Sequence, residues 1–267
     1  MSLLKEEYVR GDFAAVWDNS DIFEEAKQQQ GEIFRDKEGR RTLKFEKNGQ
    51  AFFLKLHQGI GWKEIIKNLL QLRLPIIGAQ NEWQAIKLLE QQHIDTLSIA
   101  AYGQTGINPA TQLSFLVTDE LQNSMSLEYL GEQWKKKPPS FQSKQTLIKK
   151  LALISKTMHE NGLNHRDYYL CHFLLDVSFS QTNIITDDTR LFLIDLHRAQ
   201  IRKKVPERWL VKDLGSLYFS AMAVPLTKRD LIRFMQLYTG LSYRDIVSSQ
   251  QLFWQKVNQR AMKLWNQ

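Results

Sequence analysis

The sequence predicts an α+β fold in two lobes, a small antiparallel sheet followed by a mainly helical region. Within residues 31–57, three short runs alternate apolar and polar side chains and are separated by a Glu-Gly pair and by Asn48-Gly49. Asn-Gly is a strong hairpin signal, so this stretch predicts a three-stranded antiparallel meander. After Thr118 the pattern becomes mostly helical. We therefore expect an N-lobe over residues 1–121 and a C-lobe over residues 122–267.

Two helices and a strand are predicted between the meander and the lobe boundary. Residues 60–74 and 81–91 have helical spacing and are separated by Pro75 and Gly78, which both break helices. The run 114–118 is short and apolar, which predicts a buried strand.

The C-lobe shows helical periodicity with clear start and stop signals. Residues 144–159 place their apolar side chains on one face, and the pattern ends at Asn161-Gly162. Thr227 and Ser242 each precede an aspartate by three residues, which predicts capping boxes that open two late helices. Residues 135–139, with three lysines and two prolines, predict a solvated loop.

Composition bounds the class of protein without deciding its chemistry. The chain has 267 residues, 43% of them hydrophobic, one cysteine and a net charge of +7. A single cysteine excludes an intramolecular disulfide framework, and the first residues lack the apolar core of a signal peptide, so we expect a cytoplasmic protein. The apolar run 217–226 is too short to span a membrane, which needs about twenty residues. We expect no nucleic-acid partner, because no zinc, RNP or helix-turn-helix signature accompanies the basic charge.

Two short motifs point to phosphoryl transfer. Asn164-His-Arg-Asp167 lies on a loop between a helix and an apolar run, and Ile194-Asp195 ends a second apolar run further along the chain. Protein kinases use one aspartate of an H-R-D motif at the acceptor hydroxyl and another, in D-F-G, on the metal of the nucleotide. Their order and context predict an ATP-dependent kinase with Mg²⁺, in which both carboxylates face a common cleft.

Lys55 supplies a further kinase signature. It lies on the third predicted strand, where kinases place the lysine that contacts the α- and β-phosphates, and Phe53 shares its face. A helix glutamate normally holds this lysine, and Glu64 and Glu82 are the candidates. Glu64 follows too closely for the chain to turn back, so we favour Glu82. At the lobe boundary, Asp119 and Leu121 are assigned to the nucleotide as well.

These motifs together resemble the lipopolysaccharide core heptose(I) kinase family, which has a protein-kinase-like fold. The resemblance rests on Phe53-Leu-Lys55, on Asn164-His-Arg-Asp-Tyr-Tyr-Leu-Cys-His-Phe-Leu-Leu175 and on residues 63–70, 78–83, 194–200 and 212–219. It implies that ATP phosphorylates the first heptose of a lipid-linked core oligosaccharide. It also implies work at the cytoplasmic face of the inner membrane, with peripheral membrane contact, and suggests association with acyl carrier protein.

The candidate site departs from the general kinase pattern in its phosphate loop and its metal ligands. The expected glycine-rich loop has a single glycine, and Lys37, Arg40 or Arg41 is expected to substitute as positive charge. D-F-G is replaced by Asp195-Leu-His. Asp195 is assigned to the metal, and His172 is assigned with it because it stands where kinases have a second metal-binding asparagine, although Mg²⁺ prefers oxygen ligands. The catalytic assignment is Asp167 with Arg166. The long connection 178–189 predicts an extended hairpin.

The segment that follows Asp195 is strongly basic. Residues 196–212 contain six basic residues and one acid, which predicts contact with an anionic acceptor through Arg198, Arg202 and Lys203. The segment contains no Ser, Thr or Tyr, so regulation by phosphorylation is not expected there.

Three more residues near these motifs receive a role. Tyr168 and Tyr169 are candidates to stack on a sugar ring, with core packing as the alternative. Asp213 is expected to open a helix and to bind the catalytic-loop backbone. The remaining alternatives are a kinase for another small molecule or for protein, and a catalytically silent kinase-like binding module.

Overall fold

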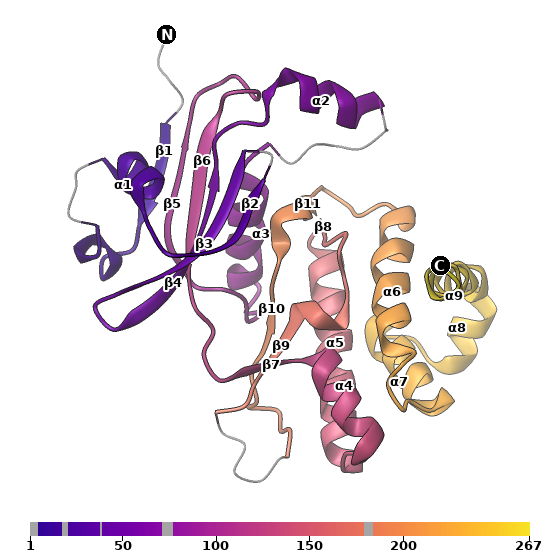
Figure 1. Ribbon diagram of the computed structural model, residues 1–267. Coiled ribbons are helices and arrows are strands. Elements are labelled where there is room, and N and C mark those ends of the chain that lie inside the picture. Colours follow the sequence, from indigo (N-terminus) through magenta and orange to yellow (C-terminus); the bar gives the residue numbers. More distant parts are fainter. Residues whose placement is uncertain (1–4, 18–20, 38, 71–76, 179–183) are drawn as a thin grey trace. The chain divides into compact units, whose positions relative to one another are not determined.

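The computed structural model divides into two compact units. The first contains residues 1–86 and 97–121, and the second contains residues 87–96 and 122–267 (Figure 1). Residues 87–96, which the sequence placed in the first lobe, therefore group with the second unit. The structure describes the whole chain except residues 1–4, 18–20, 38, 71–76 and 179–183.

The first unit is built on an antiparallel sheet in the order β1-β5-β6-β4-β3-β2. The predicted meander is confirmed, since neighbouring strands of the stretch pair in antiparallel register, and Asn48 and Gly49 both have positive φ, as a tight hairpin turn requires. The strands are β1 (Lys5–Val9), β2 (Glu32–Lys37), β3 (Arg40–Lys47), β4 (Gln50–His57), β5 (Ile99–Thr105) and β6 (Leu113–Asp119).

One face of this sheet carries the aromatic core of the first unit. The short helices η1 (Phe13–Ala15) and α1 (Ile22–Gln28) cover it. Phe13 packs edge-to-face on Phe52, and Phe23 does so on Phe115, with ring centroids 5.0 and 5.4 Å apart. Such aromatic pairs add to the free energy that burial already supplies.

The opposite face of the sheet receives helix α3 (Gln80–Gln91). Trp83 stacks on Tyr102 of β5, with ring centroids 4.5 Å apart, and the N–H of Ala79, just before the helix, donates to Ser114 Oγ of β6. The preceding helix α2 spans Gly61–Leu70. Its predicted continuation to residue 74 lies outside the described residues.

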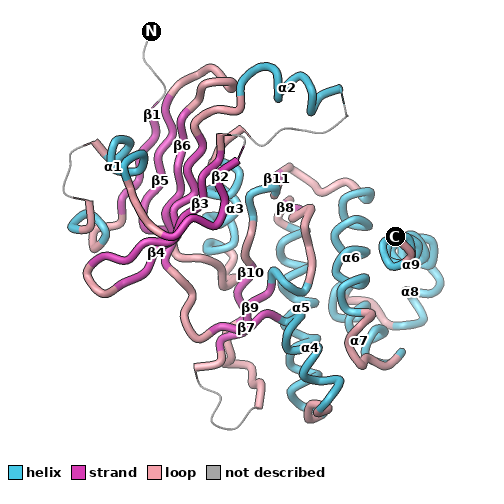
Figure 2. Tube along the Cα trace, in the orientation of Figure 1, coloured by secondary structure: helices cyan, strands magenta, loops and turns pink. Residues whose placement is uncertain are grey.

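The second unit is mainly helical (Figure 2). Helix α5 packs against α7 and α6 against α9, and Gly215 permits the second contact because a Cβ there would lie 2.5 Å from Arg260 Cγ. A full capping box opens α7, and Ser242 accepts from the Asp245 N–H at the start of α8. The helices are α4 (Leu127–Lys136), α5 (Phe141–Glu160), α6 (Glu207–Ala221), α7 (Lys228–Thr239), α8 (Tyr243–Ser249) and α9 (Gln251–Trp265).

Short strands of the second unit position its loops. Strand β9 (Phe173–Asp176) pairs with β7 (Ser124–Ser126) and with β10 (Leu191–Leu193), so the chain between β9 and β10 closes a hairpin, part of which lies outside the described residues. Strand β8 (Leu163–Asn164) pairs with β11 (Gln200–Ile201). In the described part of the chain, no helix is long and apolar enough to cross a membrane.

Candidate active site

The loop that carries Asp167 is fixed by hydrogen bonds to the side chain of Asp213. This buried carboxylate accepts the backbone N–H groups of His165 at 2.7 Å and of Arg166 at 2.8 Å. Arg166 has a φ of +75°, a left-handed conformation that costs free energy for a residue with a side chain. The predicted contact with the loop backbone is therefore present, but α6 begins at Glu207, so Asp213 lies inside the helix rather than opening it.

A buried histidine connects this loop to the segment before Asp195. Burial lowers the pKa of His165, so the ring is neutral near pH 7. Its Nε2–H donates to the Ile194 carbonyl at 2.9 Å, and its Nδ1 accepts the Asp167 N–H at 3.3 Å. A further backbone bond runs from the Ile194 N–H to the His172 carbonyl. Within the second unit, the two aspartate loops are thus joined by hydrogen bonds.

The Asp167 carboxylate is engaged by Arg198. One nitrogen of the guanidinium lies 2.9 and 3.2 Å from the two carboxylate oxygens, and the Asp167 side chain remains partly exposed. The sequence had placed Arg198 with an anionic acceptor, whereas the structure places it on Asp167, the candidate catalytic aspartate. The contact fixes the orientation of the carboxylate.

Asp195 lies at the start of η3 (Leu196–Arg198) in a left-handed conformation with a φ of +61°. Its Oδ1 accepts from His197 Nδ1 at 2.5 Å, and its Oδ2 lies 3.4 Å from His172 Nε2. Leu196 is fully buried and takes the place that the phenylalanine of D-F-G has in kinases. The replacement thus keeps an apolar anchor beside the aspartate.

His172, in η2 (Leu170–His172), contacts both aspartate loops. Burial alone would lower its pKa, but hydrogen bonds with Cys171 and with the Asp167 carbonyl, together with the Asp195 carboxylate, raise the pKa to about 9. Its Nδ1 lies 2.6 Å from the Asp167 carbonyl oxygen and must donate to it, since that oxygen only accepts. Its Nε2 lies 3.4 Å from Asp195 Oδ2, and the expectation that His172 binds the metal stays a prediction.

In the first unit, Lys55 of β4 forms an ion pair with Glu82 of α3. Lys55 Nζ lies 2.6 Å from Glu82 Oε1, and the glutamate is 1% exposed. Glu64, the alternative partner, instead accepts from Lys67 and Asn68 of its own helix. Glu82 Oε2 is buried and accepts no hydrogen bond from a described residue, so the pair retains an acceptor for a further donor.

The strand register decides which basic residues share the Lys55 face. Lys55 pairs with Thr42 and His57 pairs with Arg40, so Arg40 lies on the Lys55 face, because cross-strand partners point to the same side. Arg41 pairs with Leu56 and lies on the face of the aromatic core. Residues next to each other on a strand point to opposite sides, so Arg41 does not share the face of Lys55. The assignment of Arg41 to the nucleotide beside Lys55 is therefore wrong.

The remaining nucleotide candidates have structural partners. Phe53 shares the Lys55 face and packs on Phe34, with ring centroids 5.6 Å apart. The Asp119 carboxylate accepts two hydrogen bonds from Arg10, at 2.8 and 3.0 Å. Leu121 is half-buried at the end of the first unit. Of the three, Asp119 has its carboxylate occupied, so the structure gives it the role of anchoring the end of β6.

The acceptor candidates separate into buried and exposed residues. Tyr168 is fully buried and shares a hydrogen bond with Ser155, so the packing alternative describes it. Tyr169 is half-buried beside His172 and Phe219. Arg202 donates to the amide oxygens of Asn164 and Gln200, while Lys203 is exposed.

Asp195 is the candidate metal ligand of the second unit. Among the described residues, no group of three or more histidine, cysteine, aspartate or glutamate side chains is arranged to hold a metal ion. Mg²⁺ is usually bound by one or two carboxylates together with substrate phosphates and water. The single, partly exposed carboxylate of Asp195 fits such an ion. Sequence reasoning missed the Arg198–Asp167 pair and the contact of Arg166 with Trp209, because both join residues that are distant in sequence.

Comparison with known proteins places these motifs in a family. The profile of the lipopolysaccharide kinase (Kdo/WaaP) family matches residues 24–238. Curated proteins named lipopolysaccharide core heptose(I) kinase WaaP from Escherichia coli, E. coli K12 and Pseudomonas aeruginosa are 46%, 47% and 43% identical to the chain. The alignments cover 94%, 89% and 95% of this chain, and 94%, 89% and 93% of the relatives.

A solved structure described as WaaP in complex with acyl carrier protein shares the fold. Its TM-score is 0.84 at 37% identity, and the match covers 97% of this chain and 99% of that one.

Proposed function

Because the chain belongs to the lipopolysaccharide kinase (Kdo/WaaP) family, we propose that it transfers a phosphoryl group from ATP to the first heptose of the lipopolysaccharide core. The observation that carries the proposal is the hydrogen-bonded pair of loops that present Asp167 and Asp195 in the second unit. A loosely placed pair of carboxylates would not serve, because phosphoryl transfer depends on positioning and on charge stabilisation.

Asp167 orients the acceptor. Its carboxylate accepts a hydrogen bond from the heptose hydroxyl and receives the proton as the oxygen attacks phosphorus. Arg198 holds the carboxylate in place through its guanidinium, 2.9 Å away. Arg166 precedes Asp167 directly, and its backbone is fixed by Asp213. The acceptor oxygen therefore meets a carboxylate whose orientation is set before the sugar binds.

Asp195 is the residue that would hold Mg²⁺. The ion would neutralise phosphate charge and orient the phosphates for transfer. His172 Nε2 lies 3.4 Å from Asp195 Oδ2, and His172 remains the predicted second ligand of the ion.

Lys55, held by Glu82, binds the nucleotide phosphates from the first unit. The lysine contacts the nucleotide phosphates, and the ion pair with a buried glutamate holds its stem in one direction. Arg40, on the same face of the sheet, supplies positive charge in place of a glycine-rich loop. Arg40 therefore supplies positive charge where other kinases use the backbone amides of a glycine-rich loop, and Lys55 keeps the usual place of the kinase lysine.

The test of the proposal is Asp167→Asn assayed with lipid-linked core oligosaccharide and labelled ATP. The asparagine keeps the shape of the side chain but cannot take a proton, so turnover should fall by roughly 10²–10⁴-fold while nucleotide binding changes little. Asp188→Asn, on an exposed turn of the same unit, is the matched control. Near-normal turnover of the Asp167 variant would remove this residue from the mechanism.

The same assay separates the alternative functions. A kinase for another small molecule or for protein would label a different acceptor, and a silent binding module would label none. Labelled ATP with Mg²⁺, offered together with core oligosaccharide, other sugars and protein, therefore distinguishes the three.

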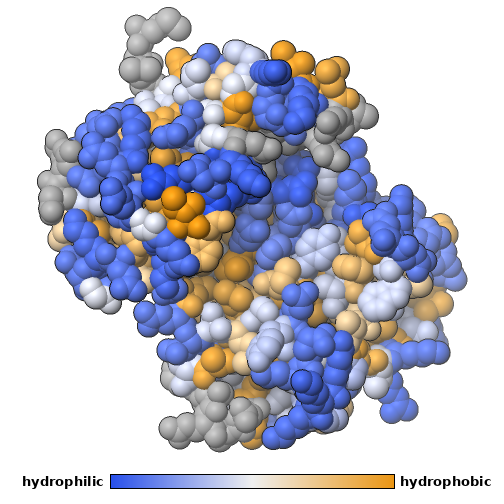
Figure 3. All heavy atoms as spheres, in the orientation of Figure 1, coloured by the Kyte–Doolittle hydropathy of each residue, from blue (hydrophilic) through white to orange (hydrophobic). Residues whose placement is uncertain are grey.

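We also propose peripheral contact with the inner membrane through α2, so that the kinase works at the cytoplasmic face, where its lipid-linked acceptor lies. Hydrophobic atoms gather over α2 on the face shown in Figure 3. Trp62, Ile66, Leu69 and Leu70 are 55%, 53%, 50% and 80% exposed, which is unusual for apolar residues spaced along one helix. An amphipathic helix of this kind inserts its apolar face at a lipid interface.

Vesicle flotation tests this contact. Ile66→Glu with Leu70→Glu should abolish co-flotation with vesicles that contain anionic lipid, because the charged helix face cannot enter the interface. Leu252→Glu is the control, since Leu252 is 73% exposed on α9 in the other unit. Equal flotation of both variants would argue against α2 as the contact.

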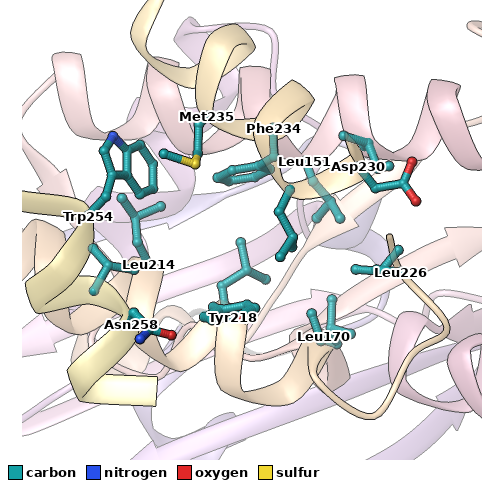
Figure 4. A pocket seen from close by; sticks show the side chains of 15 residues that line it. Leu151, Leu170, Leu214, Tyr218, Leu226, Asp230, Phe234, Met235, Trp254 and Asn258 are labelled. Carbon is teal, nitrogen blue, oxygen red and sulfur yellow. The ribbon is translucent and has the colours of Figure 1, made fainter. Parts of the chain in front are cut away.

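An acylated acyl carrier protein is proposed as a partner of the second unit. An apolar cavity of about 260 Å³ lies among α5, α6, α7 and α9, and the side chains of Leu151, Leu214, Phe234 and Trp254 line it (Figure 4). An apolar cavity of roughly 150 Å³ is enough to bind benzene, so this one has room for part of an acyl chain. Acyl carrier protein carries such a chain and is acidic, whereas this chain has a net charge of +7.

Filling the cavity tests the partner. Ala221→Phe places a ring into the space lined by Ala221. Hexadecanoyl acyl carrier protein should co-elute with the native chain on gel filtration and not with the variant. The carrier protein without an acyl chain should bind the native chain more weakly. If both carrier forms bound the native chain equally, the cavity would have no part in the association.

A further inference from the structure

Four cationic side chains surround one indole ring at the start of α6. Lys212 Nζ lies 4.3 Å from the centroid of the Trp209 ring. The guanidinium carbons of Arg166, Arg208 and Arg202 lie 5.1, 5.4 and 5.6 Å from it. These four residues, with Trp209, form the Trp209 cluster. They come from the catalytic loop, from the residue after β11 and from the first turns of α6, all within the second unit.

The carboxylates near the cluster are committed elsewhere. Glu207 pairs with Lys256 at 2.6 Å, and Asp167 pairs with Arg198 at 2.9 Å. Asp213 accepts backbone N–H groups beneath the loop. Within the described parts of the chain, no ion pair joins an acidic side chain to a cation of the cluster. The attraction of the Asp213 and Asp167 carboxylates therefore offsets the positive charges only in part, and the pKa values of Arg166, Arg202 and Lys212 stay below their ordinary values.

The cations also disfavour one another. Burial lowers the pKa of Lys212, and the charges of Arg260, Arg166 and Arg208 lower it further. The pKa of Arg166 is lowered by burial and by Arg198 and Arg202. Like charges that share a partly buried site repel in this way, and an anion placed among them removes the repulsion.

Arg202 of the cluster is held in place by neutral contacts. Arg202 donates to amide oxygens of Asn164 and Gln200, and its backbone N–H donates to the Gly162 carbonyl. Arg208 and Lys212 are four residues apart on α6 and so share one face of the helix. Neutral partners fix the guanidinium without cancelling its charge, which is the arrangement that an anion site requires.

We propose that the Trp209 cluster binds a carboxylate or phosphate group of the sugar acceptor, next to the hydroxyl that Asp167 orients. The inference deepens the proposed function and rests on it, because Arg166 directly precedes Asp167 in the chain. The cluster then selects acceptors that carry negative charge beside the reactive hydroxyl, and a neutral sugar lacks the group that it binds. Trp209 supplies an apolar floor against which the cations and the sugar pack.

The test removes two charges from the cluster and leaves the catalytic loop intact. The variant is Arg208→Gln with Lys212→Gln. Inorganic phosphate is titrated into the full native chain and the variant by calorimetry, and steady-state kinetics are measured with lipid-linked core oligosaccharide. Loss of two charge-assisted bonds should weaken phosphate binding and raise the acceptor KM by about tenfold or more, with kcat and the KM of ATP changed by less than about twofold.

The matched control is Lys228→Gln with Arg229→Gln, which removes the same charge from exposed positions at the start of α7 in the same unit. It should leave the acceptor KM within about twofold. Equal effects of the two double variants would show a diffuse field rather than a built site and would overturn the inference. Loss of phosphate binding without a change in acceptor KM would overturn the assignment to the acceptor. Thermal unfolding checks the fold, and the exposed single variant Arg208→Gln replaces the double variant if it is unstable.

Failure of the inference is distinguishable from failure of the proposed function. If the native chain phosphorylates no core oligosaccharide, the proposed function fails, whether or not the chain binds inorganic phosphate. If the native chain is active and the Arg208→Gln with Lys212→Gln variant keeps its acceptor KM and phosphate affinity, only the Trp209 cluster loses its role.

Discussion

Replacing Asp213 should destabilise the second unit far more than its single carboxylate suggests. The side chain is fully buried and accepts the N–H groups of His165 and Arg166. Asp213→Ala leaves both donors without their acceptor, and each buried unsatisfied group costs about 1–3 kcal/mol. The left-handed Arg166 loses the bond that holds it at a φ of +75°. We therefore expect a loss of about 2–6 kcal/mol in the free energy of unfolding.

Urea unfolding followed by tryptophan fluorescence measures this loss. Asp213→Asn should give an intermediate value, because one amide oxygen remains to accept while the amide NH₂ faces a donor. Asp187→Asn is the control, since Asp187 is an exposed partner of Lys149 and such pairs contribute about 0–1 kcal/mol. A folded Asp213→Ala protein that loses less than about 1 kcal/mol would refute the reasoning.

Three further predictions follow from individual contacts. Calorimetry should show that Asp195→Ala loses Mg²⁺-dependent ATP binding, whereas Lys55→Ala weakens ATP binding with and without Mg²⁺. Burial raises the pKa of Asp230, but hydrogen bonds from a lysine and at the start of α7 outweigh it and lower the pKa to about 2. This contribution, about 2 kcal/mol, is present above the unfolded pKa near 4 and is lost as pH falls to about 2, so Asp230→Asn should flatten acid-unfolding curves there. Gly162→Ala should destabilise the pairing of β8 with β11, measured by thermal unfolding, because its Cβ would lie 1.8 Å from the Arg202 carbonyl oxygen.

Elements with strong local signals were predictable from the sequence. The meander follows from alternation and from Asn48-Gly49, and α5 follows from a helical apolar pattern that ends at a glycine. Strand β5 was missed because its sequence, with Ala100, Ala101 and Gly103, has low β-propensity, and it forms a strand because β1 and β6 pair with it on both sides.

In the candidate site, too, some residues could be located from the sequence and others could not. The motifs located Lys55, Asp167 and Asp195, because kinase chemistry requires these residue types in this order. Register could not be read, so the sequence offered Arg41 beside Arg40, although one residue along a strand reverses the face. The pairing of Arg198 with Asp167 joins residues far apart in sequence, and no local pattern encodes such a contact.

The contacts that order the segment after Asp195 favour an enzyme that is active without phosphorylation of that segment. The segment after Asp195 contains no Ser, Thr or Tyr for a kinase to phosphorylate. Kinases that need such a phosphate use it to order this segment against basic residues. Here Leu196 is buried, the backbone of β11 pairs with β8, and Arg202 is held by amide oxygens. Because the segment is already ordered by these contacts, the cations of the Trp209 cluster are left available for an acceptor's charge.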